Sequence, residues 1–323
     1  MKKSRQVIFM FPGMGTQYYN MGSELYEKNR TFRQKMHQLN DIVVDSLGIS
    51  IIDSIYDPKK GEHDILDDPQ ISCLAILMIE YSLVQVLKEE GIKPDFLLGG
   101  SLGEFTSLSL SGIFNIEELL ITFYNSLEIF KRNSPRGSML GIMENVSLYE
   151  NNPEINKNSE IAVFSYDKHF VISGTQEKID SIKSFIKKNS VSFQDIPTTM
   201  PSHSSLVDPA EPEIKKLFSV LDDSKIINDD VKLISCAAAD VINTIDTDFV
   251  WNIFRKPINF QKTIEQLEKS GDHIYIDLGP GGTLATFAGL NLKGGSASKC
   301  FQIITPQGNE MEKLDELIGH LLN

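Results

Sequence analysis

The sequence predicts an α/β fold in which a large unit with a parallel sheet is interrupted by a smaller unit. The apolar run from Val7 to Phe11 stops at Pro12-Gly13, which is typical of a strand buried on both faces and followed by a tight turn. A second short apolar strand, 96–98, runs through the glycine-rich turn 99–103 into a helix, the local pattern of α/β proteins. Between about 138 and 196, strands and helices alternate at short spacing, which indicates the smaller unit.

The other elements of the large unit follow from hydrophobic periodicity and from breaker residues between the segments. The longest is an apolar helix over 71–88, followed by the breakers Gly91 and Pro94, and its composition predicts that it is mostly buried. We expect the remaining elements at 20–40 (helix), 104–111 (helix), 210–222 (helix), 231–235 (strand), 259–269 (helix), 274–278 (strand) and 310–322 (helix).

The smaller unit shows a βαββαβ-like order, which is typical of a ferredoxin-like subdomain. We therefore expect this small subdomain at 137–200 and a large subdomain made of 1–136 and 201–323. The total of 323 residues is long enough for both, since a domain has roughly 150 residues. Its expected elements are 139–143 (strand), 147–152 (helix or turn), 162–164 and 170–173 (strands), 178–188 (helix) and 191–196 (strand).

The charge balance excludes several classes of partner. Acidic residues number 44 and basic residues 31, which gives a net charge of −13. Nucleic-acid binders carry a basic excess or a basic stripe, so we expect no nucleic acid and no anionic membrane surface as partner. No run of about 18 apolar residues occurs, so we expect no transmembrane helix. A soluble cytoplasmic enzyme fits this composition.

The cysteines give no sign of a metal site. Cys73, Cys236 and Cys300 are far apart, odd in number and outside any CxxC pair, so we expect neither zinc nor a disulfide framework. The basic N-terminus is followed by an apolar run too short for a signal peptide. No cofactor motif occurs either, because the glycines at 279–282 lack the Lys-Ser/Thr of a phosphate-binding loop.

The motif with the most chemistry is Gly99-Gly100-Ser101-Leu102-Gly103, a GxSxG between a strand and a helix. In a nucleophile elbow the glycines allow a sharp turn that presents the serine hydroxyl. The helix that begins there adds backbone N–H groups and the positive end of its dipole. The alternative is a glycine-rich turn in which the serine only caps a helix.

A serine nucleophile needs a base, and His203 is the best candidate among six histidines. It lies in the polar loop 200–205, whereas His37, His63 and His320 lie in polar or helical surroundings. His169 lies beside a hairpin and His273 precedes a strand, and neither receives a role. The alternative is that His203 is merely a solvated or packed side chain.

Acyl transfer also requires donors for the oxyanion that develops in the transition state. The N–H of Leu102, directly after the serine, is one candidate. The turn Gly13-Met14-Gly15 after the first strand is the candidate for a second donor. Its alternative reading is a plain connection between strand and helix.

Four segments, taken in order, resemble the malonyl-CoA:acyl-carrier-protein transacylase family, the acyltransferases of fatty acid and polyketide synthesis. The FPGMGTQ at 11–17 is similar to the family's FPGQGSQ, and the GGSLGE at 99–104 to its GHSLGE. The PSHS at 201–204 resembles the segment of the catalytic histidine, and the DLGPG at 277–281 a C-terminal strand and turn. The resemblance covers nearly the whole chain.

The resemblance implies an α/β-hydrolase-like large subdomain, a ferredoxin-like small subdomain, and a catalytic arrangement without metal or cofactor. Ser101 would be the acylated nucleophile and His203 its base, with the N–H groups of Met14 and Leu102 as the oxyanion hole. The family orients its histidine by a main-chain carbonyl, for which we expect Asn259. The substrate would be an acyl thioester of phosphopantetheine or coenzyme A, and the partner an acyl carrier protein.

Three residues depart from the family pattern. Met14 replaces a glutamine, and Gly100 replaces the histidine or glutamine before the nucleophile. Ser126 stands where malonyl-specific members place the arginine that pairs with the malonyl carboxylate, and Arg132 lies nearly two turns further on. We expect Gly100 and Ser126 to line the acyl pocket. A malonyl carboxylate would be buried without a partner there, so we predict that malonyl-CoA is a poor substrate.

Phe9-Met10-Phe11, the segment QYYNMG at 17–22 and a GxSLGE without the histidine resemble one branch more closely. This branch is the free-standing acyl hydrolases of polyketide pathways whose acyltransferases act in trans. The favoured hypothesis is therefore an editing acyl hydrolase that removes acyl groups from carrier proteins through acyl-Ser101. The alternative is an acyl-CoA:carrier-protein transferase for an uncharged acyl unit. A third hypothesis, of another class, is a catalytically silent docking protein.

Carrier proteins are typically acidic, so docking on an acidic enzyme needs a local basic patch. Two groups are candidates, and the alternative for both is an ordinary solvated helix face. They are Lys183, Lys187 and Lys188 on the helix of the small subdomain, and Lys131 and Arg132.

Overall fold

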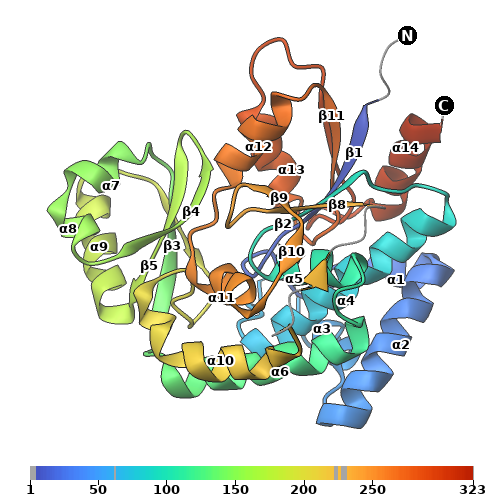
Figure 1. Cartoon of the computed structure of the whole chain (residues 1–323), viewed down its shortest axis with the longest axis horizontal. Coiled ribbons are helices and arrows are strands. Elements are labelled where there is room, and N and C mark those ends of the chain that lie inside the picture. The colour runs from blue at the N-terminus through green and yellow to red at the C-terminus, as the bar shows by residue number, and fades with distance from the viewer. Residues whose placement is uncertain (1–4, 62, 222–224, 227–230, 323) are drawn as a thin grey trace.

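The computed structural model describes residues 5–61, 63–221, 225–226 and 231–322. Its centre is a six-stranded sheet with the strand order β12-β11-β1-β2-β8-β9 (Figure 1). The strands are β1 (Gln6–Phe11), β2 (Phe96–Gly99), β8 (Lys232–Ser235), β9 (Asp240–Ile242), β11 (His273–Asp277) and β12 (Lys299–Gln302). Neighbours run parallel except β8 and β9. The parallel sheet is thus confirmed, with one reversed edge strand, because four residues between β8 and β9 allow only a hairpin.

Strand β1 shows why the apolar run at the N-terminus is continuous. Phe9 and Phe11 point into a large apolar cluster on one face of the sheet, and Ile8 and Met10 into a second cluster on the other face. All four side chains are fully buried. A strand in a sheet covered on both faces needs an apolar residue at every position.

Helices cover both faces of this sheet (Figure 1). The longest, α4, is apolar enough to cross a membrane by length and composition, but 78% of its most apolar stretch is buried in the core. Within the large unit the helices are α1 (Ser23–Lys28), α2 (Arg30–Leu47), α3 (Ile51–Ile55), α4 (Pro69–Glu89), α5 (Leu102–Leu110), α6 (Ile116–Asn133), α10 (Glu211–Leu217), α11 (Thr247–Arg255), α12 (Phe260–Glu268), α13 (Thr283–Asn291) and α14 (Glu310–Leu322).

The small unit is a four-stranded antiparallel sheet with the order β4-β5-β3-β6, which confirms the ferredoxin-like arrangement. Ile179, Ile182 and Ile186 of its long helix pack on Leu140 and Ile142 of the sheet. All of its strands fall inside the expected range 137–200. Its elements are β3 (Gly137–Ile142), α7 (Ser147–Asn151), α8 (Pro153–Asn156), β4 (Glu160–Tyr166), β5 (His169–Thr175), α9 (Gln176–Lys188) and β6 (Phe193–Ile196).

Some expected elements differ in detail. The helix expected over 20–40 is two helices, because Asn29 is extended and caps α2 with its side chain. The helix expected over 210–222 begins earlier, as the 3₁₀ helix η1 (Ser205–Ala210), and continues through α10 into η2 (Ser219–Leu221); residue 222 lies outside the described residues. Helices α11 and α13 and a two-stranded sheet of β7 (Lys225–Ile226) and β10 (Thr244–Ile245) were not predicted.

Candidate active site

Ser101 lies on a sharp turn between β2 and α5. Its backbone has φ 55° and ψ −118°, a conformation that non-glycine residues rarely adopt and that the surrounding structure must hold. A Cβ atom at Gly99 would lie 2.3 Å from the Cα of Glu104, and one at Gly103 would lie 1.9 Å from the carbonyl oxygen of Phe11. Close backbone packing therefore requires both glycines, and the turn has the geometry expected of a nucleophile elbow.

His203 lies directly against this serine. Its Nε2 is 2.9 Å from Ser101 Oγ, and its Nδ1 is 2.8 Å from the carbonyl oxygen of Lys256. A carbonyl only accepts hydrogen bonds, so the proton of the neutral ring lies on Nδ1 and Nε2 is free to accept from the serine hydroxyl. Burial lowers the pKa of His203 to about 4, so the imidazole is neutral at pH 7.

The carbonyl that orients the histidine belongs to Lys256, and the expectation of Asn259 is wrong in this detail. The Asn259 side chain donates to the carbonyls of Pro257 and Ala237 at 3.2 and 3.4 Å, and its backbone N–H donates to Cys236. Lys256 is the C-cap of α11. The last carbonyls of a helix have no N–H partner within the helix, so the Lys256 carbonyl is free to accept from His203. The acceptor is therefore the carbonyl oxygen three residues before the expected one.

The loop after β1 packs closely on the nucleophile turn. A Cβ atom at Gly13 would lie 3.0 Å from Ser101 Cβ and 3.4 Å from the nitrogen of Leu102. Leu102 is the first residue of α5, so its N–H has no partner one turn earlier in the helix. The side chain of Met14 turns toward Cys73, whose Sγ is 3.2 Å from Met14 Sδ. The backbone of Gly13 thus lies beside Ser101 and Leu102, and the next residue, Met14, lines the same cavity as Ser101.

Ser101 and His203 open into a cavity of about 210 Å³ between the large and the small unit. No Lys, Arg, Asp or Glu occurs among the described residues that line it. Gly100 belongs to the lining as expected, and so do Met139, Val171 and Ile196 of the small unit and Leu284 and Phe287 of α13. The reaction space is therefore mostly apolar and carries no fixed charge.

Ser126 lies elsewhere, and its expected place in the acyl pocket is wrong. It is fully buried in α6, and its hydroxyl donates to the carbonyl of Phe123 in the same helix at 2.6 Å. Ser126 is not among the described residues that line the cavity. The described residues that line the cavity include no Lys or Arg of α6.

His169 is a residue of this cavity to which the sequence assigned no role. Its Nδ1 is 2.9 Å from Ser165 Oγ, and its ring lies against those of Tyr166 and Phe287. Both His169 and Ser165 line the cavity. In the sequence, the feature that could have indicated a role for His169 is the hairpin between β4 and β5. His169 is the first residue of β5 and lines the cavity.

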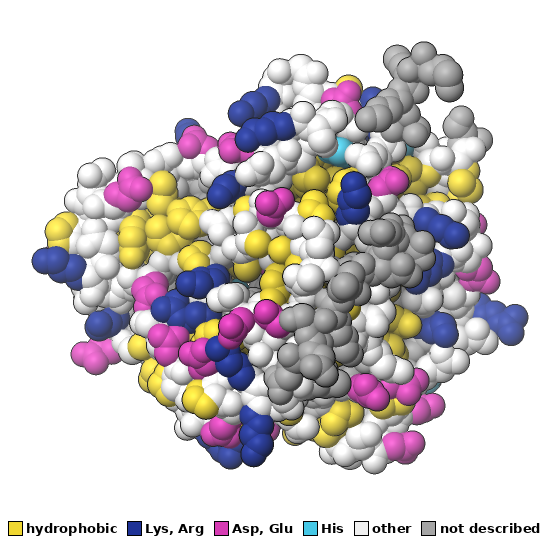
Figure 2. All heavy atoms as spheres, viewed as in Figure 1, with side chains coloured by type: hydrophobic (Ala, Val, Ile, Leu, Met, Phe, Trp, Pro, Cys, Tyr) yellow, Lys and Arg dark blue, Asp and Glu magenta, His cyan; other side chains and the backbone are white. Residues whose placement is uncertain are grey.

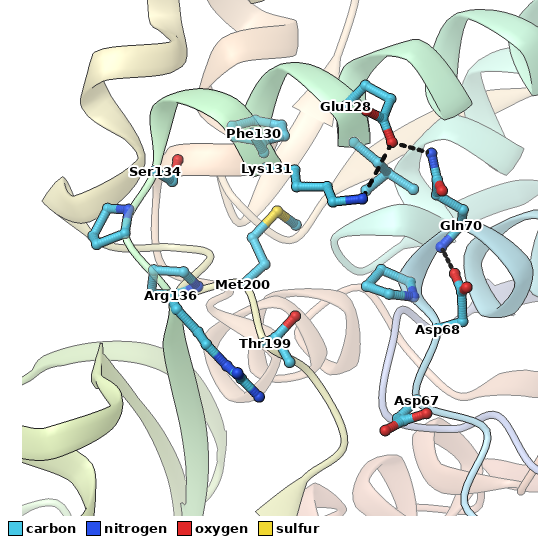
Figure 3. A pocket seen from close by; sticks show the side chains of 14 residues that line it. Asp67, Asp68, Gln70, Glu128, Phe130, Lys131, Ser134, Arg136, Thr199 and Met200 are labelled. Carbon is cyan, nitrogen blue, oxygen red and sulfur yellow. Dashed lines mark hydrogen bonds and ion pairs between the residues drawn. The ribbon is translucent and has the colours of Figure 1, made fainter.

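A second cavity, of about 510 Å³, is lined in part by the segment that leads to His203. Figure 3 shows this cavity from close by. Residues 199–201 line this cavity, and residues 198, 202 and 203 line the first one. Its walls carry Asp67, Asp68, Glu128, Lys131 and Arg136, and several of these charges are already engaged. Asp68 caps α4, and Glu128 accepts from Gln70 at 2.7 Å and lies 3.8 Å from Lys131.

An α/β fold with a serine on a strand-to-helix elbow is typical of proteins that transfer or hydrolyse acyl groups. Residues 8–303 match the acyl transferase domain family, and the chain belongs to this family. It is 38% identical to the polyketide biosynthesis acyltransferase homolog PksD of Bacillus subtilis, over 96% of this chain and 94% of that protein. Identity is 36% to the homolog BaeD of Bacillus velezensis, over 99% and 98%.

Solved structures share the fold at lower identity. The acyl transferase domain of SpnD, in complex with 2-(pent-4-yn-1-yl)malonyl, superposes with a TM-score of 0.86 at 21% identity, over 100% of this chain and 77% of that one. Malonyl-CoA:acyl carrier protein transacylase of Helicobacter pylori gives 0.80 at 20% identity, over 99% of each chain. At this identity the likeness shows the fold alone.

Proposed function

We propose that this acyltransferase-family protein is an acyl hydrolase, which removes uncharged acyl groups from acyl carrier proteins in polyketide biosynthesis. The observation that carries the proposal is the cavity at Ser101, whose described lining holds no charged side chain. The similarity to polyketide biosynthesis acyltransferase homologs supports the pathway.

The proposed mechanism uses residues of this chain only. Ser101 Oγ gives its proton to His203 Nε2 and attacks the thioester carbonyl, and the N–H groups of Met14 and Leu102 hold the oxyanion. The C–S bond breaks, the pantetheine thiol leaves with the proton from His203, and acyl-Ser101 remains. Water then gives a proton to His203 and attacks the ester, which releases the acid and restores the Ser101 hydroxyl.

The preference for an uncharged acyl group follows from the cost of burying a lone charge. A carboxylate in this cavity would lose its hydration without gaining a cation, which costs several kcal/mol. Ser126, whose hydroxyl is bound within its own helix, offers no replacement. Acetyl and other short neutral groups avoid this cost.

The hydrolytic outcome is supported by the space beside the nucleophile. A Cβ atom at Gly100 would have one neighbour within 4 Å, the carbonyl oxygen of Phe11 at 4.0 Å. Ser101 itself is partly exposed. The missing side chain leaves room for a water molecule next to an acyl-serine. The transferase alternative, with an uncharged acyl-CoA as donor, keeps the same first half-reaction and has the support of the family itself.

The deciding experiment follows the fate of one acyl group. The protein is incubated with acetyl-carrier protein, and free acetate and acetyl-Ser101 are measured, with and without a second carrier protein as acceptor. Release of acetate at the same rate without acceptor supports the hydrolase. Stable acetyl-Ser101 that is discharged only by the acceptor would support the transferase. The variant G100H is the companion test, because an added side chain should slow hydrolysis more than acylation.

The carrier-protein partner is also part of the proposal. Of the two basic groups, Lys183 pairs with Asp195, and Arg132 with Glu213 at 3.0 Å. Lys187 and Lys188 take part in no ion pair within the described part of the chain. These two lysines at the end of α9 are therefore the better docking candidates for an acidic partner.

A further inference from the structure

The position of His203 depends on three consecutive residues at the end of α11. The backbone N–H of His203 donates to the carbonyl of Phe254 at 2.9 Å, and its Nδ1 to that of Lys256 at 2.8 Å. His203 itself has φ 58°, in the left-handed region. A non-glycine residue stays in this region only where the structure around it fixes it. The segment 254–256 is what fixes it here.

Arg255, the residue between the two acceptors, is tied to two carboxylates on different elements. Its Nε lies 2.5 Å from Asp208 Oδ1 in η1, and its Nη1 lies 3.5 Å from Glu160 Oε2 at the start of β4. Glu160 also accepts from the backbone N–H of Ser205 at 2.9 Å. The guanidinium thus links α11, η1 and the small unit. In this region Figure 2 shows Lys and Arg side chains intermixed with Asp and Glu, where α11 meets the small unit in Figure 1.

The same segment continues into the small unit through its backbone. The N–H of Ile258 donates to Ala162, and the N–H of Phe164 donates to Ile258, both at 2.8 Å. Thus 254–258 is held by β4 on one side and supports His203 on the other. Among the described side chains of this segment, Arg255 is the one that pairs with two carboxylates.

We propose that Arg255 is a positioning residue, which holds the carbonyls of Phe254 and Lys256 where His203 can accept the proton of Ser101. Planar guanidinium groups suit this task, because their fixed fork holds two carboxylates in one orientation. Arg255 touches no substrate and acts only through its two neighbours. This proposal rests on the proposed roles of Ser101 and His203.

The test measures the reactivity of Ser101 without any carrier protein. An uncharged fluorophosphonate reports it: Ser101 Oγ bonds to phosphorus, fluoride leaves, and the hydroxyl proton passes to His203. We expect R255M to slow this labelling about tenfold, because a small displacement of a catalytic base costs one to two orders of magnitude. With an acyl-pantetheine thioester, kcat should fall equally while KM stays within about twofold. R255K should recover part of the rate, since an ammonium can still pair with Asp208.

Lys215 of α10, which pairs with Asp248 near the beginning of α11, provides a matched control. It also lies between two carboxylates, 2.6 Å from Glu211 and 2.6 Å from Asp248, and its exposure is close to that of Arg255. K215M should label at the wild-type rate. Ion pairs near the protein surface contribute little to stability, so both variants should melt within about 4 °C of wild type.

Each outcome decides between the proposals. Wild-type labelling of R255M, or equal loss in K215M, would overturn the role of Arg255 and leave the proposed function intact. Absence of labelling at Ser101 in the wild type would remove the proposed function and this proposal with it. Should R255M not fold, D208N breaks one arm of the link and carries the same expectation with a smaller loss of rate.

Discussion

The two cavities that residues 198–203 help to line differ mainly in charge. The one at Ser101 has no Lys, Arg, Asp or Glu in its described lining, whereas the larger one has five. In the larger cavity charges face water and one another, where they cost little. In the smaller one a charge would be enclosed by apolar walls. The proposed preference for an uncharged acyl group rests on this difference, and the predictions below test it from the largest effect to the smallest.

The largest effect should come from the base that makes the smaller cavity reactive. H203A should lower turnover about 10²- to 10⁴-fold, because no other described group is hydrogen-bonded to Ser101 Oγ. S101A should abolish the acyl-enzyme entirely. Acetate release from acetyl-carrier protein and intact mass measure both. Acetate release no faster than the uncatalysed background in both the wild type and S101A would instead support the docking-protein hypothesis.

The second prediction concerns a substrate that carries a negative charge into the cavity. Malonyl thioester should acylate Ser101 about 100-fold more slowly than acetyl thioester, because an unpaired buried carboxylate costs about 3 kcal/mol. The methyl ester of the malonyl thioester is a matched neutral probe of similar size. It should react faster than malonyl itself, as seen by intact mass. Equal rates for malonyl and its methyl ester would contradict the argument from charge.

The third prediction concerns pH and follows from the burial of His203. Its pKa, lowered to about 4, keeps the base neutral well below the usual 6.5 of a histidine. The value of kcat/KM for an uncharged acyl-pantetheine thioester should therefore be nearly constant between pH 5.5 and pH 7.5. An unshifted histidine would lose about tenfold at pH 5.5. A loss of that size would show that the imidazole is solvated in the working enzyme.

The smallest effect belongs to charges outside both cavities. The double reversal K187E/K188E should reduce turnover of acyl-carrier protein a few-fold at low salt, because long-range attraction mainly affects the rate of encounter. Turnover of a free acyl-pantetheine thioester should not change. K157E, an exposed lysine of the same small unit, is the control. Equal turnover in the double variant and the wild type would exclude this patch.

The sequence predicted the frame of the molecule well. Continuous apolar runs such as Val7–Phe11 can only be buried on both faces, and the glycines around Ser101 suit only a sharp turn, so both could be recognised locally. The break at Asn29 was missed, because apolar periodicity continues through a residue that ends one helix and caps the next. The reversed strand β9 was missed because it has only three residues, Asp240–Ile242, which are too few to show an alternating pattern.

By itself, the sequence indicated two candidate reactive residues, a serine in a glycine-rich elbow and a histidine in a polar loop. Only the tertiary structure places them 2.9 Å apart, although 102 positions separate them. The tertiary structure alone decided how the histidine is held. Every residue has the same main-chain carbonyl, so no side-chain pattern could single out Lys256 over Asn259. Likewise, His169 enters the cavity and Ser126 does not because of strand register and helix phase. Contacts between distant segments are fixed by packing of the whole chain, and local sequence does not encode them.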